Sequence, residues 1–307
     1  MKKTDISDHT FGGDWTEEKL ARVREYLTQY RQVFKKQTFL RTWYVDGFAG
    51  TGTRADRETL PVQSTTDHLF EDVYDDAETN TFRKGSATIA LGLVDPFDRY
   101  LFIDQRQRHV DALASAVKES HPALLERCEF KRGNANEVLK QWCAERDWKS
   151  ERAVVFLDPY GMQVEWTTIE ALAATRGVDL WYLFPLGIGV SRLLTRDGAI
   201  DELWCRRLDL LFGTADWRNR FYNVRQQEDL FGIREVVERD APAEKIQTFI
   251  EERLKTCFVK VADGLILRNS RANPLYSLCF AASNERGAPI ALRIAQYILK
   301  KGKPKGR

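Results

Sequence analysis

The sequence has few residues of the kinds that bind metals or form disulfides. Its five cysteines, at positions 128, 143, 205, 257 and 279, are far apart, and none forms a Cys-x-x-Cys pair. Its four histidines show no spacing that is typical of metal ligands. We therefore expect free, buried thiols in a reducing compartment, and no zinc, iron–sulfur or other metal site.

Long apolar runs and a strong net charge are also missing. No run approaches the length that spans a bilayer, and the first residues, Met-Lys-Lys-Thr-Asp, are not followed by the apolar core of a signal peptide. The formal net charge of +2 gives no general field that would attract nucleic acid. A content of 43% hydrophobic and 30% charged residues is typical of a globular protein. These features predict a cytoplasmic protein with no membrane segment.

One stretch, 43–52, stands out among what is present. It begins as a short aromatic and β-branched run, which is typical of a buried strand. It then passes through Asp46 into a turn that contains Gly50 and Gly52, where glycine lets a ligand approach the backbone closely. A strand, an acid and a glycine turn in this order are typical of the first nucleotide-binding turn of an open α/β sheet.

Strands and helices are expected to alternate along the rest of the chain. The expected strands cover 43–46, 100–104, 128–131, 153–157 and 178–184, with a final pair at 258–268 and 275–282. The expected helices cover 16–36, 87–93, 106–120, 137–146, 167–175, 243–255 and 288–300, with Thr16 and Ser86 as caps of the first two. This alternation predicts a doubly wound, mostly parallel α/β sheet.

The expected domain organisation is an N-terminal helical extension, 1–40, followed by one domain, 41–307. That domain carries a loop insertion at 53–84, which is either a solvated insertion or a lid over a ligand. It also carries an expected helical insertion at 191–242, after a glycine-bearing loop at 185–189. The last residues form a basic tail that could add nonspecific affinity for phosphates.

Two cofactors compete for the glycine turn. Gly50-Thr-Gly-Thr-Arg-Ala fits a loose dinucleotide fingerprint, but the acid about 20 residues later, Glu71, lies in an acidic loop and not at a strand end. A methyl donor needs an acid at the end of strand one, an acid at the end of strand two and a polar patch after strand four. Asp46, Asp104 and Asp158-Pro-Tyr meet these needs in order. We therefore expect S-adenosylmethionine, with Asp104 either accepting from the ribose hydroxyls or capping the next helix.

These motifs resemble those of class I S-adenosylmethionine-dependent methyltransferases, which have a Rossmann-like sheet. More narrowly, the runs 44–50 and 156–161 and the delayed helix start at 84–87 resemble the three-Cys-motif partner proteins. The resemblance covers the chain from Trp15 to the last helix. In that family the three cysteines belong to the partner protein, so the dispersed cysteines of this chain are no objection.

The resemblance implies roles for particular residues. The cofactor-binding residues would be Asp46, Gly47, Phe48, Ala49, Gly50, Gly52, Ser86, Asp104, Asn134 and Ala135, with Asn134 and Ala135 bordering the adenine. The catalytic residues beside the reactive methyl group would be Asp158, Pro159 and Tyr160. Amine methyltransferases usually have two prolines in this patch, and this sequence has one, which leaves amine specificity open.

The sequence therefore leaves two possible functions, which belong to different classes. One is an enzyme that methylates an exocyclic amine of a nucleobase in RNA or DNA, and a small-molecule acceptor is also open. The other is a partner subunit of a three-Cys-motif protein that binds or regulates it. The stretch 204–231 bears on this choice, because arginines alternate there with Trp204, Trp217, Phe221, Tyr222 and Phe231. Such a mixture suits phosphate contact with base stacking, and it equally suits a small apolar core with a charged rim.

Overall fold

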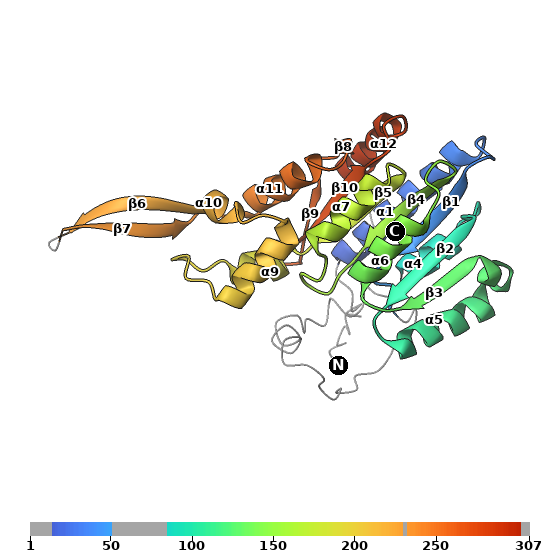
Figure 1. Cartoon of the computed structure of the whole chain (residues 1–307), viewed down its shortest axis with the longest axis horizontal. Helices are drawn as coiled ribbons and strands as arrows, with labels where there is room; N and C mark the ends of the chain where they lie inside the picture. Colours follow the sequence, from blue (N-terminus) through green and yellow to red (C-terminus); the bar gives the residue numbers. More distant parts are fainter. Residues whose placement is uncertain (1–13, 51–84, 230–231, 302–307) are drawn as a thin grey trace, which may run out of the picture.

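One mixed sheet organises the computed structural model, which describes residues 14–50, 85–229 and 232–301 (Figure 1). Its strands are β1 Arg41–Asp46, β2 Arg99–Asp104, β3 Cys128–Arg132, β4 Glu151–Leu157, β5 Val178–Phe184, β8 Lys260–Val261, β9 Leu265–Arg268 and β10 Pro274–Ala282. Their spatial order is β3-β2-β1-β4-β5-β10-β8, and β9 pairs with β10. Strands β1 to β5 are parallel, and β10 is antiparallel to its neighbours. The expected doubly wound, mostly parallel sheet is confirmed.

The strand order reverses between β1 and β4. From β1 the chain proceeds to β2 and β3 on one side, and it then crosses to β4 and β5 on the other. The two central strands end together, because Asp46 of β1 is in register with Phe156 of β4. Open α/β sheets bind ligands in the crevice outside the carboxyl ends of such strands. The fold therefore places its candidate site after Asp46 and after Leu157.

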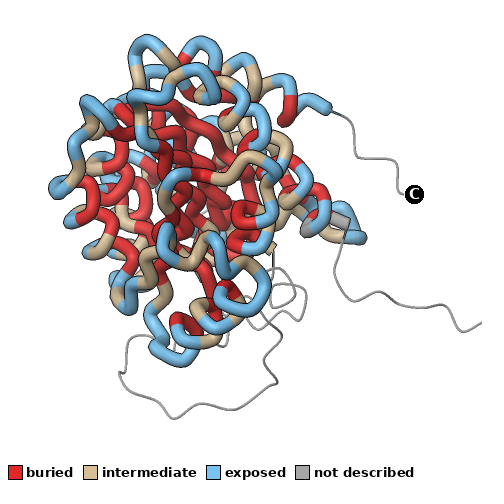
Figure 2. Tube along the Cα trace, turned by 90° about the vertical axis from the view of Figure 1, so that its right-hand side faces the viewer, coloured by how far each residue is buried: buried red, intermediate tan, exposed pale blue. Residues whose placement is uncertain are grey.

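Helices cover both faces of the sheet. Their bounds are α1 Asp14–Phe34, α4 Ser86–Leu91, α5 Gln107–Ser120, α6 Ala135–Glu145, α7 Trp166–Ala174, α11 Ala243–Lys255 and α12 Ala288–Lys300. Trp43 and Val45 of β1 point into a core that is closed by α6, α7 and α11, whereas Tyr44 points into a core closed by α1, α4, α5 and α12. Figure 2 shows that the buried parts of the chain, in red, lie at the centre of the molecule. Both faces are covered, which explains the continuous apolar runs of the strands.

Helix α1 packs on the sheet, as its apolar spacing predicts. Val23, Leu27 and Tyr30 are buried, and Leu20 and Phe34 pack partly buried against the same core. The helix begins at Asp14, so the expectation that Thr16 caps it was wrong. Because α1 shares its core with β1, β10 and α12, it is part of the same packed body as the sheet.

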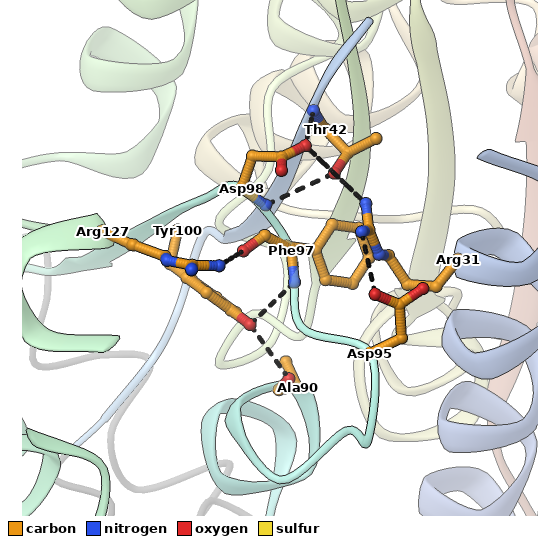
Figure 3. Close-up of polar contacts among 8 residues, drawn as sticks. All are labelled: Arg31, Thr42, Ala90, Asp95, Phe97, Asp98, Tyr100 and Arg127. Carbon is orange, nitrogen blue, oxygen red and sulfur yellow. Dashed lines mark hydrogen bonds and ion pairs between the residues drawn. The ribbon is translucent and has the colours of Figure 1, made fainter. Parts of the chain in front are cut away.

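The amino-terminal edge of the sheet is tied to α1 by charged pairs. Arg31 of α1 lies 3.2 Å from Asp95 and 3.7 Å from Asp98 (Figure 3). Asp98 also accepts hydrogen bonds from the backbone N–H and the hydroxyl of Thr42, at 2.8 and 2.7 Å. These contacts hold the end of α1 beside the start of β1. The first turns of α1 therefore lie over the opposite edge, where the strands end.

The segment 191–242 is only partly helical, which corrects the expectation from the sequence. It contains the short helices α8 Ser191–Leu193, α9 Glu202–Phe212 and α10 Trp217–Phe221. It then forms an antiparallel hairpin of β6 Tyr222–Asp229 and β7 Gly232–Arg239, which extends away from the body in Figure 1. Because the hairpin is held by main-chain pairing and buries little apolar surface, its sequence lacks the alternation of apolar and polar residues that identifies a strand.

Smaller differences concern the ends of elements. The expected loop 185–189 forms a π-helical turn, Leu186–Val190, because Gly187 lets it approach β10 so closely that a Cβ there would lie 1.8 Å from the carbonyl oxygen of Pro274. The expected strand 258–268 is divided into β8 and β9. A 3-10 helix, Pro122–Arg127, precedes β3. The expected loop insertion and most of the basic tail lie outside the described residues.

The five cysteines lie within the described ranges and are free. Cys143 and Cys279 are buried, as expected, whereas Cys128, Cys205 and Cys257 are half-buried. Among the described residues, no cluster of three or more His, Cys, Asp or Glu side chains could hold a metal ion. No helix in these ranges has the length and apolar character required to cross a bilayer.

Candidate functional site

Asp46, at the end of β1, is completely buried and joins three elements. Its Oδ2 accepts hydrogen bonds from the hydroxyls of Ser86, at 2.6 Å, and Tyr44, at 3.4 Å, and its Oδ1 accepts the backbone N–H of Phe48 at 3.1 Å. Burial raises the pKa of Asp46 to about 6, although the Ser86 and Phe48 hydrogen bonds oppose this rise. Asp46 therefore braces the glycine turn against the start of α4.

The role of Ser86 differs from the expected cap. Gly85 is the N-cap of α4, and it makes no side-chain capping hydrogen bond. Ser86 is the first residue of the helix and is buried. Its hydroxyl is committed to Asp46, so the side chain supports the site from behind.

Backbone hydrogen bonds attach the glycine turn to the neighbouring strands. The N–H groups of Gly47 and Ala49 donate to the carbonyls of Phe156 in β4 and Ile103 in β2, at 3.0 and 2.9 Å. Gly50 has a φ of +63°, which favours glycine, and its N–H donates to Oδ2 of Asp104 at 3.1 Å. The turn is thus held between both neighbours of β1. Gly52, also predicted to bind the cofactor, lies outside the described residues.

Asp104, at the end of β2, supports the turn and the next helix together. Besides Gly50, it accepts the backbone N–H of Arg106 at 2.8 Å, and its Oδ1 lies 3.1 Å from Nδ1 of His109. Arg106 is the N-cap of α5, so Asp104 supports the start of that helix without capping it. Asp104 therefore ties the glycine turn to the start of α5.

Asn134 and Ala135 follow β3 next to Asp104, since the N–H of Gly133 donates to the Asp104 carbonyl at 3.1 Å. Asn134 caps α6 by accepting the backbone N–H of Asn136 at 2.9 Å, and Ala135 is buried. The side chain of Asn136, which the sequence analysis missed, donates to the carbonyl of Gln163 at 2.9 Å. It therefore joins the end of β3 to the loop after β4.

That loop carries the three predicted catalytic residues. Asp158 immediately follows β4 and keeps 13% of its side chain exposed. Pro159 is buried, and Tyr160 is half-buried, with its backbone N–H donating to Oε1 of Gln163 at 3.1 Å. Gly161 closes the turn with a φ of +60°. The patch thus lies at the switch point of the sheet, beside the end of β1.

Lys19 of α1 is the partner of Asp158 that sequence reasoning missed. Its Nζ lies 3.3 Å from Oδ2 of Asp158, and its side chain has no exposed surface. Burial lowers the pKa of Lys19 to about 7, while the Asp158 and Asp46 carboxylates act in the opposite direction. The rings of Trp15, Phe156 and Tyr276 surround the ammonium at 5.4 to 5.9 Å.

The arginine and aromatic stretch forms a small core with a charged rim. Trp217 and Phe221 are buried and unable to stack on a base. Arg218 makes two hydrogen bonds to Asp209, at 2.7 and 3.0 Å. The other described pairs join Arg206 to Glu202, Arg220 to Glu252 and Arg225 to Glu238. Phe231 lies outside the described residues. Of the two alternatives from the sequence, this arrangement matches the small apolar core with a charged rim.

Comparisons with known proteins add little to this geometry. No protein-family model matches the chain, and no curated protein matches it significantly in sequence. Among solved structures, a Legionella pneumophila protein is 11% identical, covering 81% of this chain and 92% of its own, with a TM-score of 0.36. Spermidine synthase in complex with the transition-state analogue AdoDATO is 11% identical, covering 96% and 70%, with a TM-score of 0.38.

The glycopeptide N-methyltransferase MtfA, complexed with S-adenosyl-L-methionine, is 10% identical to this chain. The alignment covers 92% of this chain and 99% of MtfA, with a TM-score of 0.34. Likenesses this weak carry no argument about activity. The fold assignment therefore rests on the strand order, and the function must be argued from the site.

Proposed function

We propose that this protein is an S-adenosylmethionine-dependent methyltransferase that modifies an exocyclic amine of a nucleobase in RNA or DNA. The observation that carries the proposal is the meeting of Asp46, Asp104 and Asp158 at the carboxyl ends of β1, β2 and β4. In the sheet, β1 lies between the other two strands, so these acids border the crevice at the switch point.

The residues fit the proposed cofactor in their chemistry. Asp104 lies at the end of β2, where a carboxylate can accept hydrogen bonds from the two hydroxyls of a ribose. The turn 47–50 brings the backbone close to the crevice, with Asp46 bracing it from below. When bound, S-adenosylmethionine would supply a methyl group on a sulfonium, which is an electrophile without need of a metal.

Asp158, Pro159 and Tyr160 would act on the acceptor. The lone pair of a conjugated amine is spread into its ring, so the amine is a poor nucleophile in its planar form. Hydrogen bonds from the amine to the Asp158 carboxylate and the Pro159 carbonyl favour the pyramidal form. They strengthen as positive charge develops on nitrogen, and therefore stabilise the transition state. Tyr160 would hold the base plane by stacking.

The experiment is methyl transfer from isotopically labelled S-adenosylmethionine to total RNA, to DNA and to free nucleosides. Labelled N-methylated adenine or cytosine, identified by mass spectrometry after digestion, is the expected result. If the label appears only in small-molecule amines, the acceptor is a small molecule and not a nucleobase. If calorimetry shows that the protein does not bind S-adenosylmethionine, the proposal that it is a methyltransferase is wrong.

A second candidate function is that of a partner subunit in the three-Cys-motif partner family. The β6–β7 hairpin favours it, because Val224 and Ile233 are 61% and 69% exposed on a ribbon that extends from the body (Figure 1). Exposed apolar side chains on an extended ribbon suit contact with another protein. The two functions are compatible, since the hairpin lies apart from the acids of the site.

A further inference from the structure

The cation position beside Asp158 is filled by the protein itself. Lys19 reaches from α1 to within 3.3 Å of the Asp158 carboxylate and is fully buried there. Three rings lie around its ammonium: Trp15 at 5.4 Å, and Phe156 and Tyr276 both at 5.9 Å. A carboxylate with a group of aromatic rings is the usual setting for binding a ligand ammonium. In this protein the ammonium comes from an internal lysine.

Lys19 changes which acceptors Asp158 can bind. An aliphatic amine is an ammonium ion near neutral pH, so it would bring a second positive charge next to a buried one. Two like charges about 4 Å apart repel strongly in a partly buried site. A nucleobase amine is uncharged, so it can donate a hydrogen bond to Asp158 without this repulsion.

We propose that Lys19 is a specificity-determining residue that excludes cationic aliphatic amines from Asp158 and so reserves the site for neutral, ring-conjugated amines. This inference rests on the proposed function and narrows its substrate class. It also favours the nucleobase over a small aliphatic amine.

The groups that face Lys19 determine how its protonation depends on pH. Asp158 after β4 and Asp46 at the end of β1 both stabilise the ammonium, and Tyr276 of β10 faces it with a ring. On α1 itself, Glu18 is bonded to Arg22 at 2.7 Å. Because burial lowers the pKa of Lys19 to about 7, the ammonium is lost at mildly alkaline pH. The exclusion of cationic amines from Asp158 should therefore weaken as the pH rises from about 6 to about 9.

The test measures the affinity of the folded protein for methylammonium by NMR titration, with adenosine as the neutral probe. We compare wild type, Lys19→Met and Lys19→Arg at about pH 6 and pH 9, where methylammonium remains charged. Lys19→Met should bind methylammonium about tenfold or more tightly than wild type at pH 6, because one positive charge is gone. Lys19→Arg should exclude methylammonium at both pH values. Wild type should gain affinity for methylammonium at pH 9.

Equal methylammonium affinity of wild type and Lys19→Met would overturn the inference. If Lys19→Met does not fold, Lys19→Gln takes its place, and equal methylammonium affinity of wild type and Lys19→Gln would overturn the inference. No methyl transfer is needed for either measurement. A failure of the proposed enzyme activity is therefore distinguishable from a failure of the role of Lys19.

Discussion

Ser86 and Asp46 are 40 residues apart in the sequence, yet their side chains share a 2.6 Å hydrogen bond in the buried base of the site. This bond favours the ionised form of a carboxyl group whose pKa burial has raised to about 6. It therefore joins the delayed helix start of α4 to the end of β1. The turn between them depends on both residues.

Ser86→Ala should destabilise the protein by about 1–3 kcal/mol, because it leaves a buried acceptor with one partner fewer. The pKa of Asp46 should rise further, so the loss should be larger at about pH 8, where Asp46 is ionised, than at about pH 5, where it holds its proton. Urea unfolding at both pH values measures the difference. Exposed Ser120→Ala is the control. A loss of equal size at both pH values would contradict the coupling to Asp46.

Asp104→Ala should weaken binding of S-adenosylmethionine by about 1–3 kcal/mol, from the hydrogen bonds lost to the ribose. The variant also frees the N–H of Gly50, so Asp104→Asn serves as the conservative comparison that keeps a side-chain acceptor. Calorimetry with S-adenosylmethionine and its demethylated product gives the affinities. Binding of NAD in their place would show that the cofactor is wrong.

Asp158→Ala should reduce turnover by a factor on the order of 10² or more, through the loss of about 3 kcal/mol of transition-state stabilisation. Affinity for the cofactor should change much less. Single-turnover methyl transfer and calorimetry separate the two effects, and exposed Asp111→Asn is the control. Undiminished turnover in a stable variant would remove Asp158 from the mechanism.

Asp179 gives a prediction about stability alone. It is buried, it accepts the hydroxyl of Tyr26 at 2.7 Å, and burial raises its pKa to about 7. A carboxyl group whose pKa is raised by folding contributes stability at low pH, which is lost as pH rises from about 4 to about 7.

Asp179→Asn should remove this loss, because the amide keeps an acceptor for Tyr26 and does not ionise. From about pH 4.5 to pH 8, stability should shift in favour of the variant by an amount on the order of 3 kcal/mol. Denaturant titrations at several pH values provide the measurement. Parallel pH curves for wild type and variant would show that Asp179 keeps its ordinary pKa.

The β6–β7 hairpin should be removable without loss of the fold. Replacing 224–237 by Asn-Gly keeps Tyr222, which donates to the carbonyl of Thr195 at 3.0 Å, and Arg239, which donates to the carbonyl of Leu194 at 2.7 Å. Melting temperature and cofactor affinity should stay close to wild type, whereas association with a protein partner should be lost.

The double variant Val224→Asp/Ile233→Asp should lose the same association with the hairpin intact, because it removes only exposed apolar contacts. Loss of cofactor binding on deletion would instead assign the hairpin to the site. If the complex with the protein partner still forms with both variants, the partner binds a surface other than the hairpin.

The sheet could be predicted from the sequence because β1, β2, β4 and β5 are mostly apolar runs, and the first three of these end in or are followed by an aspartate. Strand β5 and helices α11 and α12 were predicted with the bounds they have. The hairpin was missed because its stability comes from backbone pairing, which leaves no apolar pattern. The arginine and aromatic stretch was ambiguous because a sequence does not say whether Trp217 and Phe221 point inward.

Within the site, the acids and glycines were recognisable because each follows a predicted strand. Lys19 was missed, since a lysine on a helix is normally exposed and its partner Asp158 is 139 residues away. One signal was present. Trp15, Lys19, Arg22 and Tyr26 recur at three and four residues, and all four are buried. A charged residue on such a stripe indicates a buried partner.

The packing of α1 also determines when the site can form during synthesis on the ribosome. Trp15 and Tyr26 contact Tyr276 and Phe280 of β10, with ring centroids 5.3 and 5.0 Å apart, and Arg22 donates to the carbonyl of Lys301 at 2.8 Å. A nascent chain is made from its N-terminus, so α1 emerges some 250 residues before the strand it packs on. The part of its apolar stripe that packs on β10 and α12 stays uncovered while β1 to β5 are made. The rings around the internal ammonium are thus complete only once Tyr276 of β10 has been synthesised, well after Asp46, Asp104 and Asp158.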